Sequence, residues 1–371
     1  MLLQLGNESR EHLLTGATAV VDAVKFTLGP KGSTAIFNQD GNLVITKNGI
    51  AIVNQITFED PVCNMGAELL KQVAAKTNIM VNDGTTTAML IAYKIIKDSY
   101  VRIADNANAI DIKRGIDIAT SAILIELDTL SRSCSSQTEI KQVAITSANG
   151  DSEIGEIIAD ALQKVSKETV ISVEGSNNLK TSVEMFTDQD NINIIAGRYV
   201  MQFKGNLLES EKTKLYECLK MAGNALIIKI GGATGVEIRE KTERAEKALV
   251  ATWAAINGGI VPGGGVALIR ARNVINVKGL NSDQYAGISI LLKAVEEPLR
   301  YIISNAKPVN KTLVQKLLHS TDDAIGYDVL TSEYVDMFEQ GIVDPTDIVK
   351  TALINAVSIA GMAITSNCTI C

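Results

Sequence analysis

The chain is organised around one turn, Asn82-Asp83-Gly84-Thr85-Thr86-Thr87. This turn lies between two stretches whose apolar residues recur at helix spacing. Apolar residues recur at helix spacing over residues 65–74, and residues 88–96 continue as a second helix. The N–H groups at the start of a helix lack partners and attract phosphate. Asp83 adds a carboxylate of the kind that Mg²⁺ prefers beside phosphate oxygens. The simpler interpretation is an Asp N-cap followed by a Thr-rich first turn.

The composition narrows the class of protein. The chain has 371 residues, of which 46% are hydrophobic and 4% aromatic, and a net charge of -7. This length predicts two or three domains, and the charge does not suggest a nucleic-acid partner. The longest uncharged run, residues 351–367, is too short for a membrane span and predicts a buried helix. Five scattered cysteines indicate reduced thiols, and no N-terminal signal is visible, so we expect a cytoplasmic protein without a membrane partner.

The pattern of apolar residues, glycines and prolines predicts a mainly helical chain with a few strands. The polar stretch at residues 131–136 indicates a domain boundary. A final helix is expected after Asp344-Pro345, with Asp344 as its cap. We further expect helices at residues 11–28, 111–130 and 236–256, two shorter helices within 140–167, a hairpin at 33–46, strands at 170–173 and 225–230, and a loop at Tyr327-Asp328.

Four turns that contain glycine indicate which protein family the sequence resembles. They are Thr27 to Gly32, Lys47-Asn48-Gly49, Asp83 to Thr87 and Pro262-Gly263-Gly264-Gly265. In this order they resemble the large subunit of the group I chaperonins, the GroEL type. The resemblance runs along nearly the whole chain. Its blocks are residues 24–32, 64–67, 83–88, 113–117, 263–270, 297–300 and 341–346.

The resemblance implies a mainly α fold whose equatorial domain comes from both chain ends. That ATP-binding domain would comprise residues 1–130 and 258–371, and a small α+β intermediate domain residues 131–186 and 225–257. Residues 187–224 are too few for the family's apical domain, so we expect only a short remnant there. The client-binding groove and the surface for the lid co-chaperonin would be lost with it.

The resemblance also implies ATP and Mg²⁺ as cofactors and assigns residues to them. Asp83 would bind the metal, while Lys47 would lie near the phosphates. The other residues expected at the nucleotide are Thr27, Leu28, Gly29 and Pro30 along the phosphates, Gly84, Thr85, Thr86 and Thr87 cradling them, Gly264 against the nucleotide, Asp328, Val329 and Leu330 around the adenine, and Asp344 on the ribose.

Two positions depart from the family pattern. The family has Lys-Asp-Gly in the turn after the hairpin, and this chain has Asn48 there. The family has an aspartate on the long helix before the glycine-rich turn, and this chain has Lys247. An amide cannot accept a proton as a base, and an ammonium repels Mg²⁺. Loss of a general base costs about 10²–10⁴-fold in rate, so we expect no intact catalytic residue.

The sequence is compatible with three functions. The chain is an ATP-dependent folding subunit that works with full-length chaperonin subunits, a non-hydrolysing nucleotide-binding scaffold, or a decayed paralogue. Intact phosphate-binding turns argue against the third. The edges of the 33–46 hairpin are open to pairing, and in the family such a hairpin pairs with the neighbour's chain ends. We therefore expect a homo-oligomer, a ring or partial ring, with residues 2–5 and 363–365 as the partner strands.

Overall fold

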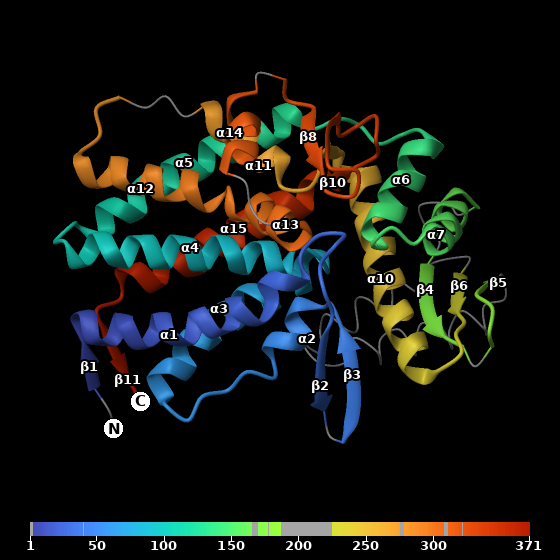
Figure 1. Ribbon diagram of the computed structural model, residues 1–371, viewed down its shortest axis with the longest axis horizontal. Helices are drawn as coiled ribbons and strands as arrows, with labels where there is room; N and C mark the ends of the chain where they lie inside the picture. The colour runs from blue at the N-terminus through green and yellow to red at the C-terminus, as the bar shows by residue number, and fades with distance from the viewer. Residues whose placement is uncertain are drawn as a thin grey trace. The chain divides into compact units, whose positions relative to one another are not determined.

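The structure is a computed structural model, and it describes residues 3–39, 41–164, 170–176, 178–186, 225–274, 278–307, 311–320 and 322–371 (Figure 1). The chain divides into two compact units. The first unit is Met1–Ser135 with Val250–Cys371, and the second is Ser136–Leu249. The fold is mainly α, as predicted. The expected remnant at residues 187–224 lies outside the described residues.

The first unit is a helical core assembled from both ends of the chain. Figure 1 shows α4 running between the pair α1–α3 and the pair α5–α12. Side chains such as Ile91, Ile95 and Leu353 are fully buried in one continuous apolar cluster. The long helices of this core are α1 (Gly6–Val24), α3 (Pro61–Val81), α4 (Thr85–Ala104), α5 (Ala109–Leu130), α12 (Ser282–Ala294) and α15 (Thr346–Thr365).

Helix α15 is the buried helix that the uncharged run predicts. In the described part of the chain it is the one helix that is long and apolar enough to cross a membrane by length and composition. Two thirds of that apolar window, 67%, is buried inside the protein. Its contacts are with α3, α4 and α5, so its apolar residues serve the core of the first unit.

Pairs of glycines bring the main helices into backbone contact. A Cβ placed on Gly16 of α1 would lie 1.8 Å from the carbonyl oxygen of Cys63, and one on Gly66 of α3 would lie 1.9 Å from that of Leu13. The α5–α12 pair repeats this arrangement with glycines on both helices. Because a Cβ cannot occupy such positions, each glycine pair fixes how closely its two helices approach.

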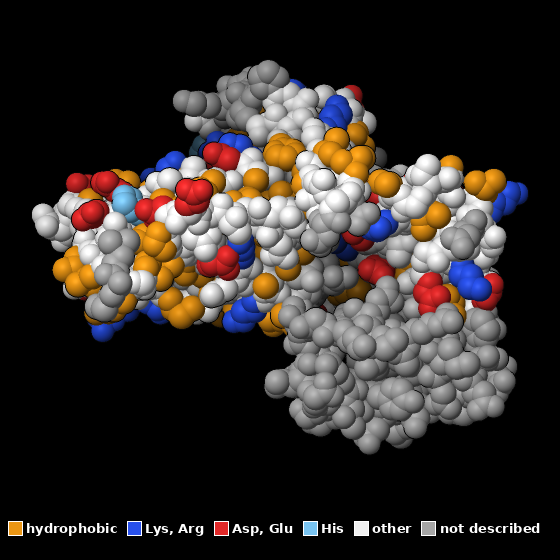
Figure 2. Space-filling model, turned by 90° about the horizontal axis from the view of Figure 1, so that it is seen from below, with side chains coloured by type: hydrophobic (Ala, Val, Ile, Leu, Met, Phe, Trp, Pro, Cys, Tyr) orange, Lys and Arg blue, Asp and Glu red, His pale blue; other side chains and the backbone are white. Residues whose placement is uncertain are grey.

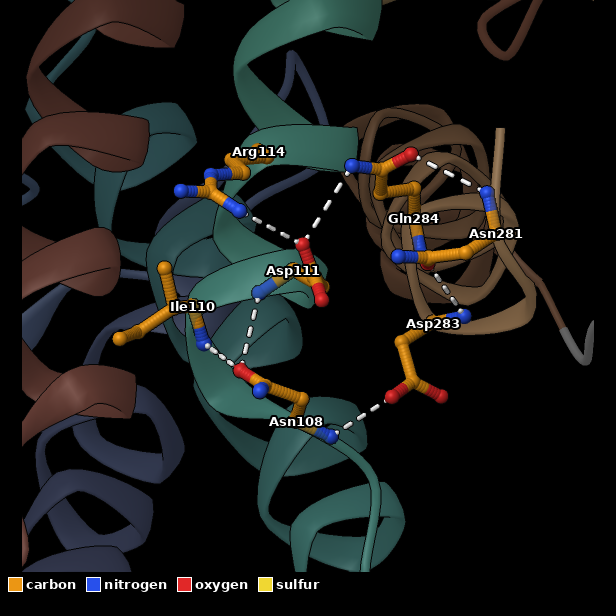
Figure 3. A network of polar contacts seen from close by, with 7 residues as sticks. All are labelled: Asn108, Ile110, Asp111, Arg114, Asn281, Asp283 and Gln284. Atoms are coloured by element: carbon orange, nitrogen blue, oxygen red, sulfur yellow. Dashed lines mark hydrogen bonds and ion pairs between the residues drawn. The ribbon is translucent and has the colours of Figure 1, made fainter. Parts of the chain in front are cut away.

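The starts of α5 and α12 are also joined by a polar network (Figure 3). Asp283 of α12 accepts a hydrogen bond of 2.8 Å from the backbone N–H of Asn108, the N-cap of α5. Gln284 donates to Asp111 at 3.3 Å, and Arg114 pairs with the same carboxylate at 3.0 Å. Side chains from each helix thus satisfy groups at the start of the other.

Short two-stranded sheets complete the first unit. The predicted hairpin is present as β2 (Ala35–Gln39) and β3 (Asn42–Thr46), which pair antiparallel. Near it in sequence is the short helix α2 (Gly49–Val53). Strand β1 (Leu3–Leu5) pairs antiparallel with β11 (Cys368–Ile370). The expectation of a strand at residues 363–365 is wrong, because these residues end α15 and the strand follows them.

The loop predicted at Tyr327-Asp328 is also wrong. Both residues belong to β8 (Ile325–Asp328), which forms a hairpin with β9 (Glu333–Asp336). The rings of Tyr327 and Tyr334 meet edge to face across the two strands, at 5.4 Å between centroids, and such aromatic pairs stabilise antiparallel strands. The other elements here are η1 (Lys25–Thr27), β7 (Ile260–Pro262), α11 (Val266–Ala271), η2 (Arg272–Val274), α13 (Glu297–Ala306), α14 (Lys311–His319) and β10 (Val343–Pro345).

The second unit is a small α+β body. Helices α6 (Gln137–Ser147) and α7 (Ser152–Lys164) match the two predicted short helices. The predicted strands appear as β4 (Val170–Gly175) and β6 (Ala225–Ile230), which pair in parallel, and β5 (Ser182–Phe186) adds an antiparallel edge. Helix α10 (Gly235–Gly258) begins in this unit and continues into the first.

Replacing Gly66 with alanine should destabilise the first unit, because the new Cβ meets the Leu13 backbone. Overpacking of this kind costs roughly 1–3 kcal/mol. Gly235→Ala is the control, since nothing lies within 4 Å of a Cβ there. Urea unfolding followed by circular dichroism measures both variants. Equal midpoints for the two would contradict the argument from close helix packing.

Candidate nucleotide-binding site

The turn between α3 and α4 leaves the first turn of α4 open. Asn82 and Gly84 both adopt left-handed backbone angles, with φ of 50° and 73°. Gly84, not Asp83, is the N-cap of α4, so the Asp N-cap interpretation is wrong. The Asp83 carboxylate instead accepts the Gly84 N–H at 2.8 Å. No side chain caps α4, and its first backbone bond joins the Ala88 N–H to the Gly84 carbonyl.

The N–H groups of Thr85, Thr86 and Thr87 therefore have no hydrogen-bond acceptor among the described residues. The positive end of a 20-residue helix dipole adds to these donors. Donors and dipole together favour an anion at this position.

Two glycines let backbone segments approach this helix start. A Cβ on Gly49 would lie 2.6 Å from the Thr86 hydroxyl oxygen, so the Lys47-Asn48-Gly49 turn packs on the start of α4. A Cβ on Gly84 would lie 3.1 Å from Ile348 of α15. Segments from the first hundred residues and from the chain's last helix thus meet at α4.

Asn48 occupies this turn with an unusual polar environment. Its backbone N–H donates to the Thr46 hydroxyl at 2.9 Å, and it is the N-cap residue of α2 without a side-chain capping bond. Its amide oxygen is buried and has no hydrogen-bond partner among the described residues. A buried acceptor without a donor is open to a hydrogen bond from water or a ligand. Lys47 beside it is half-buried and forms no ion pair with a described residue.

Asp344, from the C-terminal half of the chain, lies near Asp83. It lies in β10 opposite Val261, whereas Pro345 is the N-cap of α15 without a side-chain bond. The expectation that Asp344 caps that helix is therefore wrong. The reason is that the Thr346 N–H already donates to the Gly259 carbonyl, which extends the strand pairing to the helix start.

The carboxyl of Asp344 is strongly perturbed. Burial raises its pKa to about 7, and the negative charge of Asp83 contributes to this rise. A hydrogen bond from the Gly264 N–H acts in the opposite direction. Asp83, Gly264 and Asp344 are consequently neighbours, although they are far apart in sequence.

The Thr27 to Pro30 turn is held by α13. The Thr27 hydroxyl is buried and donates to the Val24 carbonyl at 2.7 Å. Gly29 has φ of 84°, and a Cβ there would lie 3.1 Å from Ile302. The Asn305 amide donates to the carbonyls of Lys25 and Leu28 at 2.8 and 2.9 Å. No hydrogen bond between described residues joins Leu28, Gly29 or Pro30 to residues 83–87, so helix packing alone relates the two turns.

The residues expected around the adenine form the tip of the β8–β9 hairpin. The Asp328 carboxylate accepts the Leu330 N–H at 2.8 Å and the Thr331 hydroxyl at 2.9 Å, so it stabilises its own turn. Val329 is buried and Leu330 is 61% exposed. Gly264 lies beside this hairpin, since a Cβ on it would be 3.6 Å from Met337. Lys247 lies on α10 within the second unit.

Sequence reasoning missed Asn305, Ile302 and Ile348. Asn305 is a single amide near the end of a short helix, and the two isoleucines look like ordinary core residues. No local signal marks any of the three. Their roles appear only when the fold places them against Gly29, Leu28 and Gly84.

The arrangement suits a magnesium–phosphate ligand. The open start of α4 offers donors to phosphate, and the neighbouring carboxylates of Asp83 and Asp344 offer acceptors to a cation. Among the described residues no group of three or more His, Cys, Asp or Glu could hold a metal by itself. A cation here would need phosphate oxygens to complete its coordination, as Mg²⁺ commonly does.

Comparison with known protein families identifies the family of this chain. The model of the TCP-1/cpn60 chaperonin family matches residues 20–197 and 182–371. These two segments cover nearly the whole chain, so the protein belongs to the TCP-1/cpn60 chaperonin family. The family predicted from the glycine-containing turns is thereby confirmed. The two matches overlap at residues 182–197, which include the start of the segment 187–224 where only a remnant of the apical domain is expected.

The first unit should lose stability as the pH rises from about 4 to 7. A carboxyl whose pKa is raised on folding stabilises the fold below its unfolded pKa, and that contribution disappears as the pH passes the folded value. Three pKa units correspond to at most about 4 kcal/mol. Urea midpoints at pH 5 and 7 should differ less in Asp344→Asn than in the wild type. The control is Asp105→Asn at the exposed end of α4, and an unchanged pH dependence in Asp344→Asn would contradict the assignment.

Proposed function

We propose that this chaperonin-family protein binds Mg-ATP in its first unit and hydrolyses it very slowly. Membership of the family supports a chaperone-type function. The observation that carries the proposal is the contact between the Asn48-Gly49 turn and the open start of α4. The start of α4 is free of a side-chain cap at this contact, and the residue before Gly49 is an amide.

Binding is supported by backbone groups that substitution has not altered. The N–H groups of Thr85, Thr86 and Thr87 would receive phosphate oxygens, and Asp83 would hold the metal. Bound Mg²⁺ would neutralise phosphate charge and relieve the repulsion between Asp83 and Asp344. The Gly264 turn and the hairpin at Asp328 would enclose the nucleoside, with Asp344 at the ribose.

Slow hydrolysis follows from the two replaced acids. The Asn48 amide can orient a water molecule but cannot take its proton. Lys247 cannot replace a carboxylate, whether it contacts a phosphate as a positive charge or points into solvent. Each lost acid removes roughly 10²–10⁴-fold in rate when it acts as a general base.

The alternative is a folding subunit that hydrolyses ATP together with full-length chaperonin subunits in the cytoplasm. Steady-state phosphate release by the purified chain separates the two functions. We favour a nucleotide-binding scaffold, because both altered positions are acids in the family pattern. A decayed paralogue is disfavoured by the close packing that Gly49 and Gly84 maintain around α4.

Assembly through the strand edges of the first unit belongs to the same proposal. Ile36 and Leu43 are exposed on the β2–β3 hairpin, and Leu3, Leu5 and Ile370 are exposed on the β1–β11 pair. Figure 2 shows apolar side chains gathered at the end of the first unit that carries β1 and β11. Each is a two-stranded sheet with open edges, so the hairpin of one copy would pair with the chain ends of the next.

The double reversion Asn48→Asp with Lys247→Asp should raise ATP turnover well above that of the wild type. Single reversions should give less than the pair, because groups that act on one transition state are not additive. Steady-state phosphate release measures turnover. Asp83→Ala in the reverted background is the control and should abolish the gain. A wild-type rate that the double reversion cannot improve would show that another residue supplies the base.

Removal of residues 1–5 should weaken the oligomer, because it deletes β1 and leaves β11 without its partner. Ile36→Lys should have a similar effect from the hairpin side. Sedimentation velocity measures the assembly. Ile125→Lys on α5 is the matched control, since Ile125 is 68% exposed and lies outside both sheets. Unchanged sedimentation of both altered chains would refute assembly through these edges.

A further inference from the structure

We propose that Asn305 is a positioning residue for the phosphates of the bound nucleotide. The inference rests on the proposed function and deepens it, because it adds the Thr27 to Pro30 turn, which the family resemblance expects along the phosphates, to the proposed nucleotide site. The observation is the pair of hydrogen bonds from one side-chain amide to the backbone carbonyls of Lys25 and Leu28, at 2.8 and 2.9 Å.

The two carbonyls lie where a helical segment ends. Lys25 opens η1, and Leu28 follows it with extended backbone angles. Carbonyl groups at the end of a helix have no intrahelical donor and must find one elsewhere. The side-chain amide of Asn305 carries two N–H donors, and one nitrogen serves both carbonyls. Asn305 therefore satisfies this helix end from a different part of the chain.

The direction of these carbonyls determines the direction of an amide. The peptide unit between Leu28 and Gly29 is planar and trans, so its N–H points opposite to its C=O. Because the Leu28 carbonyl is directed at Asn305 on α13, the Gly29 N–H is directed away from α13. This N–H has no hydrogen-bond partner among the described residues. Asn305 thus keeps carbonyl oxygens on one side of the turn and presents a donor on the other.

The directions of the carbonyl and N–H groups in this turn affect how well it can bind an anion. A phosphate near the turn would be repelled by a carbonyl oxygen and attracted by an N–H group. Gly29 permits the arrangement, since its φ of 84° is a conformation that residues with a Cβ rarely adopt. Pro30 has no N–H and fixes the next backbone angle. The Gly29 N–H is thus a donor available to phosphate, and Asn305 fixes its direction.

Helix α13 is held by contacts with other parts of the first unit, so the position of Asn305 is fixed as well. The Leu299 backbone packs against Gly265, where a Cβ would lie 2.9 Å from the Leu299 nitrogen. Lys307, the C-cap of α13, donates a hydrogen bond to the Tyr327 hydroxyl of the β8–β9 hairpin. Helix α13 therefore contacts the glycine-rich turn, the β8–β9 hairpin and the Thr27 to Pro30 turn, and Asn305 makes the hydrogen bonds to the last of these.

The test uses the full-length chain and four variants. Asn305→Asp has the same shape but places a carboxylate against two carbonyls, and Asn305→Ala removes the donors without adding charge. Ser304→Ala is the matched control, because the adjacent Ser304 hydroxyl donates only within α13, to Tyr301. Asn305→Ser keeps a single donor. Calorimetric titration with Mg-ATP and with magnesium tripolyphosphate gives the affinities, and thermal unfolding without ligand gives the stability.

We expect Asn305→Asp to weaken both ligands by at least about tenfold at pH 7.5, from two lost hydrogen bonds and a new repulsion. Asn305→Ala should lose less and Asn305→Ser less again, whereas Ser304→Ala should match the wild type. Protonation of the introduced carboxyl restores one donor. The ratio of the Asn305→Asp dissociation constant to that of Asn305→Ala should therefore shrink between pH 7.5 and 5.5, a change that a general loss of stability would not produce.

Affinities for both ligands that equal the wild type in Asn305→Asp and Asn305→Ala would overturn the inference and leave the proposed function intact. A loss with Mg-ATP but not with tripolyphosphate would overturn it as well, because the effect would then act on the nucleoside. Failure of the wild-type chain to bind Mg-ATP would refute the proposed function and this inference together.

Discussion

The unpaired N–H groups in the first turn of α4 are the constraint on which the site depends. No side chain caps this helix, and the segments around it approach through glycine backbone. A Cβ on Gly49 or Gly84 would meet Thr86 or Ile348, so larger residues would force these segments away. The same need for close backbone approach recurs between α1 and α3 and between α5 and α12. Glycine backbone thus allows close approach both in the helical core and around the start of α4.

Charge at the start of α4 supports the proposed binding of Mg-ATP, and the amide at Asn48 supports the proposed slow hydrolysis. Asp83 and Asp344 lie close enough for the charge of the first to raise the pKa of the second, which favours a cation between the phosphates and the protein. Asn48 lies in the turn that packs on the start of α4, and its buried amide oxygen lacks a donor among the described residues. An amide keeps the size and the acceptor of a carboxylate and lacks its basicity. Under the proposed function, substitution at this one position would separate affinity for Mg-ATP from its turnover.

Sequence patterns predicted the long helices, the β2–β3 hairpin and the strands β4 and β6, because each has a period or a turn residue of its own. The patterns predicted the wrong structure for residues whose conformation depends on pairing with distant parts of the chain. Asp344 looked like a helix cap but pairs in a strand, and Tyr327 looked like loop but pairs with Tyr334. The C-terminal strand lies beyond residues 363–365 because the apolar core extends α15 through them. Sequence motifs predicted that the turns at Asp83 and Gly264 belong to the site. Asn305 is in no such motif, and it contacts the site only through hydrogen bonds to two carbonyls of a turn distant in sequence.

The central claim is that the first unit retains Mg-ATP without consuming it. The most direct measurement is the identity of the bound nucleotide after the purified chain has been incubated with Mg-ATP, separated from free ligand and denatured. The account predicts that ATP, in close to one equivalent per chain, is recovered after many minutes. Recovery of mainly ADP at the earliest times, or of no nucleotide at all, would contradict it.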